Sequence, residues 1–222
     1  LDKETLDIFT EVAEGLEGIF RMPSGCFEQT SSTTYPSILA LDFLTKSKSI
    51  NPELEAKARG FISDGYQRLV TFETSGGGFS VFGKEPASTV LSAYGLMELA
   101  EMSRVASVDQ VLLDRTRDFL YRRRSSDGGF QRISTYDEKE VQEAKDDVVV
   151  TAYVAWALAT ATAKPEQDDR LKNVLDVVMK KAPLPEGDDP YALALRANAL
   201  LAGGRANDAK TLLDRLVPQA IR

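Results

Sequence analysis

The sequence predicts an all-α protein, an α/α toroid of repeated helical hairpins, from three observations. Apolar residues recur with a helical period along most of the chain, with almost no alternation of period two. Gly-Gly-Phe occurs at 77–79 and again at 128–130, each time between two helical segments. Segments that are apolar all round alternate with segments that are charged on one face, as expected for inner and outer helices of successive hairpins.

Short connecting segments that contain Gly, Pro or Asp separate the expected helices. The first covers about 3–20, and a loop at 22–29 leads into a helix that has Pro36 in its first turns and ends near Lys48. Asn51 followed by Pro52 is a helix start signal, with Asn51 as the N-cap of a helix that reaches about 72. Beyond it we expect two outer helices, at about 107–124 and 167–181. We also expect three inner helices, one at about 86–104, one that begins near 148 and one that begins near 190.

Length and charge limit the classes of function. The 222 residues suit one large domain or two small ones. The net charge is −7 without a basic stripe, which argues against binding to nucleic acid or to an anionic membrane surface. No apolar run approaches the roughly 20 residues that span a bilayer, and the charged start shows no signal peptide. Both ends fall within helix-like runs, which indicates a piece of a larger protein.

The sequence has no histidine and one cysteine, Cys26. The missing histidines exclude Cys-His and Ser-His catalytic arrangements, and they make an ordinary Cys/His zinc site untenable. We therefore predict no metal site and no cofactor. One cysteine also allows no internal disulfide.

The candidate functional stretch is Gly25-Cys26-Phe27-Glu28-Gln29. One tight turn can bring the Cys26 thiol to the Gln29 carboxamide, where displacement of ammonia by sulfur gives an internal thioester. Ser24 and Gly25 favour a turn before the pair, and the following hydroxyl residues favour a helix start. A helix N-terminus would stabilise negative charge on the sulfur and on a developing oxyanion. The alternative from the residues alone is a buried structural cysteine, because free cysteine is often buried and this spacing is not diagnostic.

This stretch resembles the Gly-Cys-Gly-Glu-Gln motif of the thioester domains of α-macroglobulins and complement components. Phe27 stands where those proteins have the second glycine. Bacterial relatives of that family often have a larger residue there, so the resemblance points to a bacterial α-macroglobulin homologue. It continues in the same order along the chain at 65–69, 82–83, 88–94 and 127–130.

The resemblance implies a single thioester domain over 1–222, as a fragment of a larger multidomain protein. It implies an α/α toroid that lacks its last hairpin or two, because the family's domains close the ring with further helices. The implied function is covalent capture of proteases or nearby surface amines, as a single-turnover protease trap rather than a turnover enzyme. The partners would include the other macroglobulin domains, and the parent protein would be extracellular or periplasmic.

The resemblance also implies roles for individual residues. Cys26 supplies the leaving sulfur and Gln29 the acyl carbon, while Glu28 either accepts a turn hydrogen bond, assists proton movement or has no role. Relatives that esterify hydroxyl groups use a histidine from a later loop, and Glu138 stands at that place here. We therefore predict direct aminolysis, with lysine amines preferred over hydroxyl groups.

The aromatic residues Phe20, Phe27 and Tyr35 are candidate covers that keep water from the thioester, although ordinary core packing is the alternative for each.

Two other classes of function stay open at this point. One is a non-covalent protein-interaction toroid in which the thiol never closes. The other is an α/α-toroid enzyme of the terpene cyclase or prenyltransferase kind, for which the acidic pairs at 146–147 and 168–169 are the candidates. These pairs lack the Asp-x-Asp-Asp and Asp-Asp-x-x-Asp patterns, so solvated or capping roles explain them better.

Overall fold

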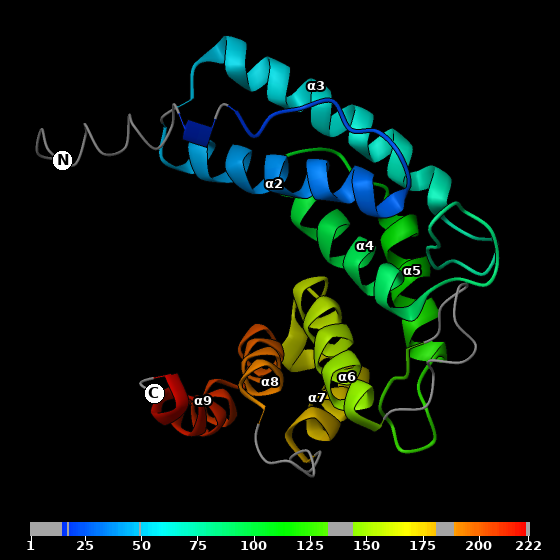
Figure 1. Ribbon diagram of the computed structural model, residues 1–222, viewed down its shortest axis with the longest axis vertical. Coiled ribbons are helices and arrows are strands. Elements are labelled where there is room, and N and C mark those ends of the chain that lie inside the picture. Colours follow the sequence, from blue (N-terminus) through cyan, green and yellow to red (C-terminus); the bar gives the residue numbers. More distant parts are fainter. Residues whose placement is uncertain (1–14, 17, 49, 133–143, 181–188, 221–222) are drawn as a thin grey trace, which may run out of the picture.

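The computed structural model describes residues 15–16, 18–48, 50–132, 144–180 and 189–220. Every regular element in these ranges is a helix (Figure 1), which confirms the all-α prediction. Most of the helix expected at 3–20 lies outside the described residues. The elements are α2 (Phe27–Lys46), α3 (Pro52–Leu69), η1 (Val70–Phe72), α4 (Thr89–Met102), α5 (Gln110–Arg122), α6 (Ala144–Thr160), η2 (Pro165–Gln167), α7 (Asp169–Lys180), α8 (Pro190–Ala202) and α9 (Ala206–Ala220).

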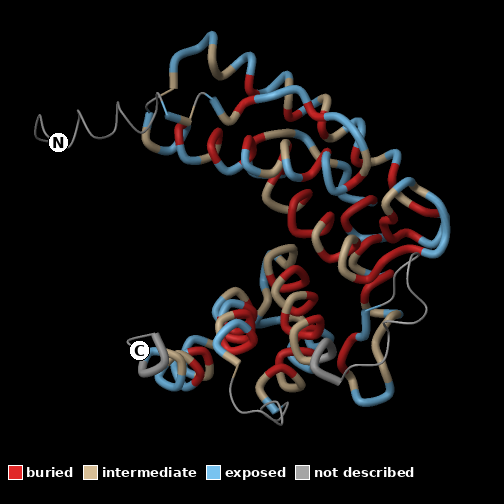
Figure 2. Tube along the Cα trace, in the orientation of Figure 1, coloured by how far each residue is buried: buried red, intermediate tan, exposed pale blue. Residues whose placement is uncertain are grey.

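The helices form hairpins that follow one another along an arc (Figure 1), as an α/α toroid requires. Helices α2, α4, α6 and α8 pack against one another in that order, and α3, α5, α7 and α9 each pack on the preceding one of these. The buried residues lie along the seams between the helices (Figure 2). The predicted alternation of inner and outer helices is therefore present in the described part of the chain.

Helix α2 starts earlier than the sequence suggested. Pro36 lies near the middle of α2 instead of in its first turns. An interior proline costs a helix about 3 kcal/mol. The cap at Cys26 and a long buried face on α2 offset that cost. The next helix, α3, starts as predicted, because Asn51 Oδ1 accepts a hydrogen bond from the Leu54 N–H at 2.8 Å.

The two Gly-Gly-Phe loops are structural repeats. In each, the phenylalanine is buried and its N–H donates to a hydroxyl on the next inner helix, from Phe79 to Ser92 at 2.8 Å and from Phe130 to Thr151 at 2.9 Å. Both loops thus tie the end of an outer helix to the next inner helix. The first of them also reaches the N-terminus of α2, where the motif lies.

Candidate functional site

Cys26 and Gln29 form a capping box at the N-terminus of α2. Cys26 is the N-cap residue, and its sulfur accepts from the backbone N–H of Gln29. In return, Gln29 Oε1 accepts from the Cys26 N–H at 3.1 Å. Thr30 N–H donates to the Cys26 carbonyl at 2.9 Å and so closes the first turn of the helix. The structure therefore brings the predicted pair together within one helical turn, with each side chain held by the other residue's backbone.

Gly25 lets the Gln29 carboxamide lie against the backbone. Its φ is +82°, and a Cβ placed there would lie 2.0 Å from Gln29 Oε1 and 2.8 Å from Gln29 Cδ. Only glycine fits both the backbone angle and the close approach. On the α3 side, Arg68 Nη2 donates to the Gly25 carbonyl at 2.6 Å. The turn that precedes the motif is thus fixed from a helix distant in sequence.

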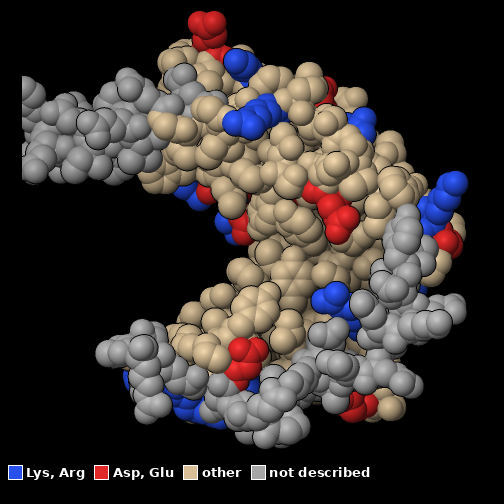
Figure 3. All heavy atoms as spheres, viewed as in Figure 1, with Lys and Arg blue, Asp and Glu red and all other residues tan. Residues whose placement is uncertain are grey.

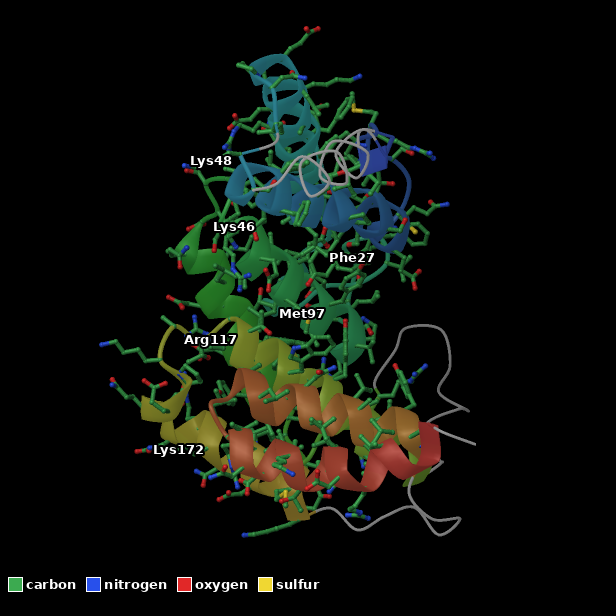
Figure 4. All side chains as sticks on the ribbon, turned by 90° about the vertical axis from the view of Figure 1, so that its left-hand side faces the viewer. Phe27, Lys46, Lys48, Met97, Arg117 and Lys172 are labelled. Atoms are coloured by element: carbon green, nitrogen blue, oxygen red, sulfur yellow. The ribbon has the colours of Figure 1, made fainter. Side chains whose placement is uncertain are left out.

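Phe27 anchors the motif in the core. Its side chain is fully buried, and its ring centroid lies 5.4 Å from that of Phe79 and 6.0 Å from that of Phe72. Figure 4 shows Phe27 where α2 meets α4, and its ring also contacts Tyr94 on α4. Phe27 therefore has the core-packing role that was the alternative to shielding, because the first residue of α2 faces the inner seam.

The other two candidate covers belong to the core as well. Phe20 is buried, and the half-buried Tyr35 packs against the core with its ring tilted against that of Tyr94, at 5.7 Å between the ring centroids.

Glu28 is exposed in the first turn of α2, where the helix dipole favours a carboxylate. It lies on the wall of a pocket of about 390 Å³ next to the motif. The lining residues come from the motif, the first glycine-rich loop, the start of α4 and the end of the second such loop: Glu28, Val81, Phe82, Ser88, Val90, Leu91 and Arg132. The other predicted site residue, Glu138, lies outside the described residues.

A buried acid, Glu98, lies behind the motif helix. Both carboxyl oxygens are buried and lack a hydrogen-bond partner among the described residues. Burial raises the pKa of Glu98 to about 8, and the nearby Ser31 hydroxyl on α2 tempers that rise without forming a hydrogen bond. Sequence reasoning passed over Glu98, although a lone acid in the apolar run 96–99 was an available signal.

The acidic pairs behave as helix-end and surface residues where they are described. Asp168 Oδ1 accepts from the N–H groups of Arg170 and Leu171, which caps α7, and Asp169 forms an exposed ion pair with Lys172. Among the described residues, no cluster of three or more Asp, Glu or Cys side chains is arranged to hold a metal ion. No helix within the described ranges is long and apolar enough to cross a bilayer. On the face shown in Figure 3, charged side chains are scattered and do not gather into a patch of one sign.

A family model and two known proteins each match nearly the whole chain. The family model of the A-macroglobulin TED domain matches residues 2–222. The chain is 26% identical to "Thioester-containing protein 1 allele S1" of Anopheles gambiae, over 97% of this chain and 16% of the mosquito protein. It is 27% identical to "Alpha-2-macroglobulin-like protein 1" of Mus musculus, over 97% of this chain and 15% of the mouse protein. The chain thus spans about one sixth of the length of these relatives.

Proposed function

Because this chain belongs to the A-macroglobulin TED domain family, we propose that Cys26 and Gln29 close an internal thioester that acylates primary amines. The observation that carries the proposal is the capping box, in which Gln29 Oε1 lies 3.1 Å from the Cys26 nitrogen. The domain would serve as the covalent capture element of a longer, extracellular or periplasmic protein whose other macroglobulin domains control its exposure. Its targets would be proteases or surface amines, each captured once.

Closure follows from the geometry of the pair. The Cys26 sulfur attacks Gln29 Cδ, an S–C bond forms, the C–N bond breaks, and the thiol proton leaves with the amide nitrogen as ammonia. The negative charge of the tetrahedral intermediate develops on Oε1, which already accepts from the Cys26 N–H at a distance suited to oxyanion stabilisation. The positive end of the α2 dipole favours charge on both the sulfur and this oxygen. Gly25 keeps the space for the carboxamide open.

Acyl transfer then consumes the thioester. An amine nitrogen attacks Cδ, the C–S bond breaks, and the sulfur leaves and takes up the proton that the amine loses. The leaving sulfur returns to the helix N-terminus, where the Gln29 N–H stabilises it. We assign Glu28 to proton removal from the incoming ammonium, since it is an exposed carboxylate on the residue that directly precedes Gln29. The sequence contains no histidine that could form an acyl-imidazole, so the proposed acceptor is an amine and not a hydroxyl group.

Intact mass and thiol labelling test the proposal. Freshly purified protein should be lighter than its sequence mass by one ammonia and should resist thiol reagents. Methylamine should add its whole mass at Gln29, which leaves the protein heavier than its sequence mass by one methylene group, and should release one thiol at Cys26. Glycerol should react more slowly than methylamine. Full sequence mass together with immediate labelling of Cys26 would contradict the proposal.

The rival function is a non-covalent interaction toroid with a free thiol. The observation in its favour is that the same hydrogen bonds make an ordinary capping box without any covalent bond. Full sequence mass with a reactive Cys26, found also in the longer protein, is the result that this function predicts.

A further inference from the structure

We infer that the pocket beside Glu28 selects the acyl acceptor, and that it favours a primary amine carried on an apolar or aromatic group. The inference rests on the proposed thioester and names the substrate class of the same site. The pocket adjoins the motif directly, because Glu28 lies on its wall and is bonded to Gln29. Its volume of about 390 Å³ falls within the range of small-ligand sites.

The pocket wall is fixed to the reacting turn. The Phe27 N–H donates to the carbonyl of Val81 at 3.1 Å, so the loop that carries Val81 and Phe82 is held against the N-terminus of α2. Arg68 on α3 donates a hydrogen bond to the Gly25 carbonyl and so also fixes the turn. The pocket is therefore held beside the first turn of α2, with Glu28 of the motif on its wall.

The chemistry of the lining matches an amine with an apolar body. Val81 and Phe82 from the loop and Val90 and Leu91 from α4 give the pocket apolar walls. Phe82 is 60% exposed, an aromatic ring that the fold itself does not bury. Glu28 and Arg132 are the charged residues of the lining, and the Glu28 carboxylate is the group that can bind an ammonium and take its proton before the nitrogen attacks Gln29 Cδ. A lysine next to an apolar side chain on a target protein has this combination.

Competition between two amines of similar basicity tests the inference. Phenethylamine and ethanolamine carry the amine on the same kind of arm and differ in the group at its far end. We expect the full chain to couple phenethylamine about tenfold faster, as measured by intact mass and thiol release over time, because apolar contacts in a pocket give discrimination of about this size. Phe82→Ala and Val90→Thr should each lower this ratio by about threefold or more.

Two control variants, and whether any amine couples at all, distinguish the possible results. Phe43→Ala and Val111→Thr change an exposed phenylalanine and an exposed valine outside the pocket lining, and they should leave the ratio unchanged. Equal rates for the two amines, or a ratio that Phe82→Ala and Val90→Thr do not alter, would overturn the inference and leave the thioester proposal intact. A protein that has lost no ammonia and couples neither amine would overturn both.

Discussion

Replacing Glu98 by glutamine should remove a pH dependence of stability that the wild-type chain carries. The pKa of this buried carboxyl is about 8 in the folded chain, against 4.5 for an exposed glutamate. Between these values the folded state holds a proton that the unfolded state has released, so the free energy of unfolding falls as pH rises. At about 1.4 kcal/mol per pH unit, the whole window accounts for about 5 kcal/mol. Below about pH 4.5 the buried carboxyl causes no loss of stability, and above about pH 8 the loss no longer grows with pH.

Urea unfolding of the wild type and of Glu98→Gln at about pH 5.5 and about pH 7.5 measures this effect. The two proteins share every other titrating group, so the difference between their free energies of unfolding should change by about 2.5 kcal/mol in favour of the variant at the higher pH. Glu166→Gln, at an exposed position, is the matched control and should follow the wild type. Parallel pH curves for the wild type and Glu98→Gln would refute the reasoning, because they would show that Glu98 titrates alike in the folded and unfolded chains.

Two glycine substitutions test the packing that positions the motif. Gly25→Ala should abolish ammonia loss and methylamine coupling and cost about 1–3 kcal/mol, since its Cβ would overlap the Gln29 carboxamide at a φ of +82°. Gly60→Ala, in open space on α3, is the control and should raise stability by about 0.5–1 kcal/mol with closure unchanged. Gly65→Ala should cost about 1–3 kcal/mol in urea unfolding, because its Cβ would lie 2.3 Å from Thr34 Oγ1 across the α2–α3 seam. Thr34→Ala should relieve that cost in the double variant, and purely additive losses would contradict the contact.

The helical pattern and local start signals made much of the fold predictable. The period of the apolar residues, the Asn51-Pro52 signal and the repeated Gly-Gly-Phe loops all correspond to observed structure. The family match likewise confirms the resemblance that the ordered motifs suggested. Pro36 was misplaced because proline is usually favourable only in the first turn of a helix. Here the start of α2 is set instead by the cap at Cys26.

The parts of the site that escaped prediction depend on contacts between distant segments. Arg68 reaches the Gly25 carbonyl across 43 positions of sequence, and no local pattern specifies such a pairing. The inward direction of Phe27 likewise depends on where α4 and its preceding loop pack. The resemblance at 65–69 did mark a relevant segment, since it contains Gly65, which packs on Thr34, and Arg68. The resemblance did not indicate which contacts these two residues make.

The identity of the N-cap itself argues for chemistry at Cys26. The other α-helices with a described side-chain cap use the oxygen-bearing residues that caps ordinarily prefer, namely Asn51, Ser88, Asp109, Asp168 and Asp189. Serine at position 26 would accept the same hydrogen bond with a better acceptor than sulfur, so helix capping alone does not explain a cysteine there. Gln29, by contrast, is a usual partner in a capping box. The cap thus accounts for how the two side chains meet, and the proposed thioester would account for a cysteine at the cap.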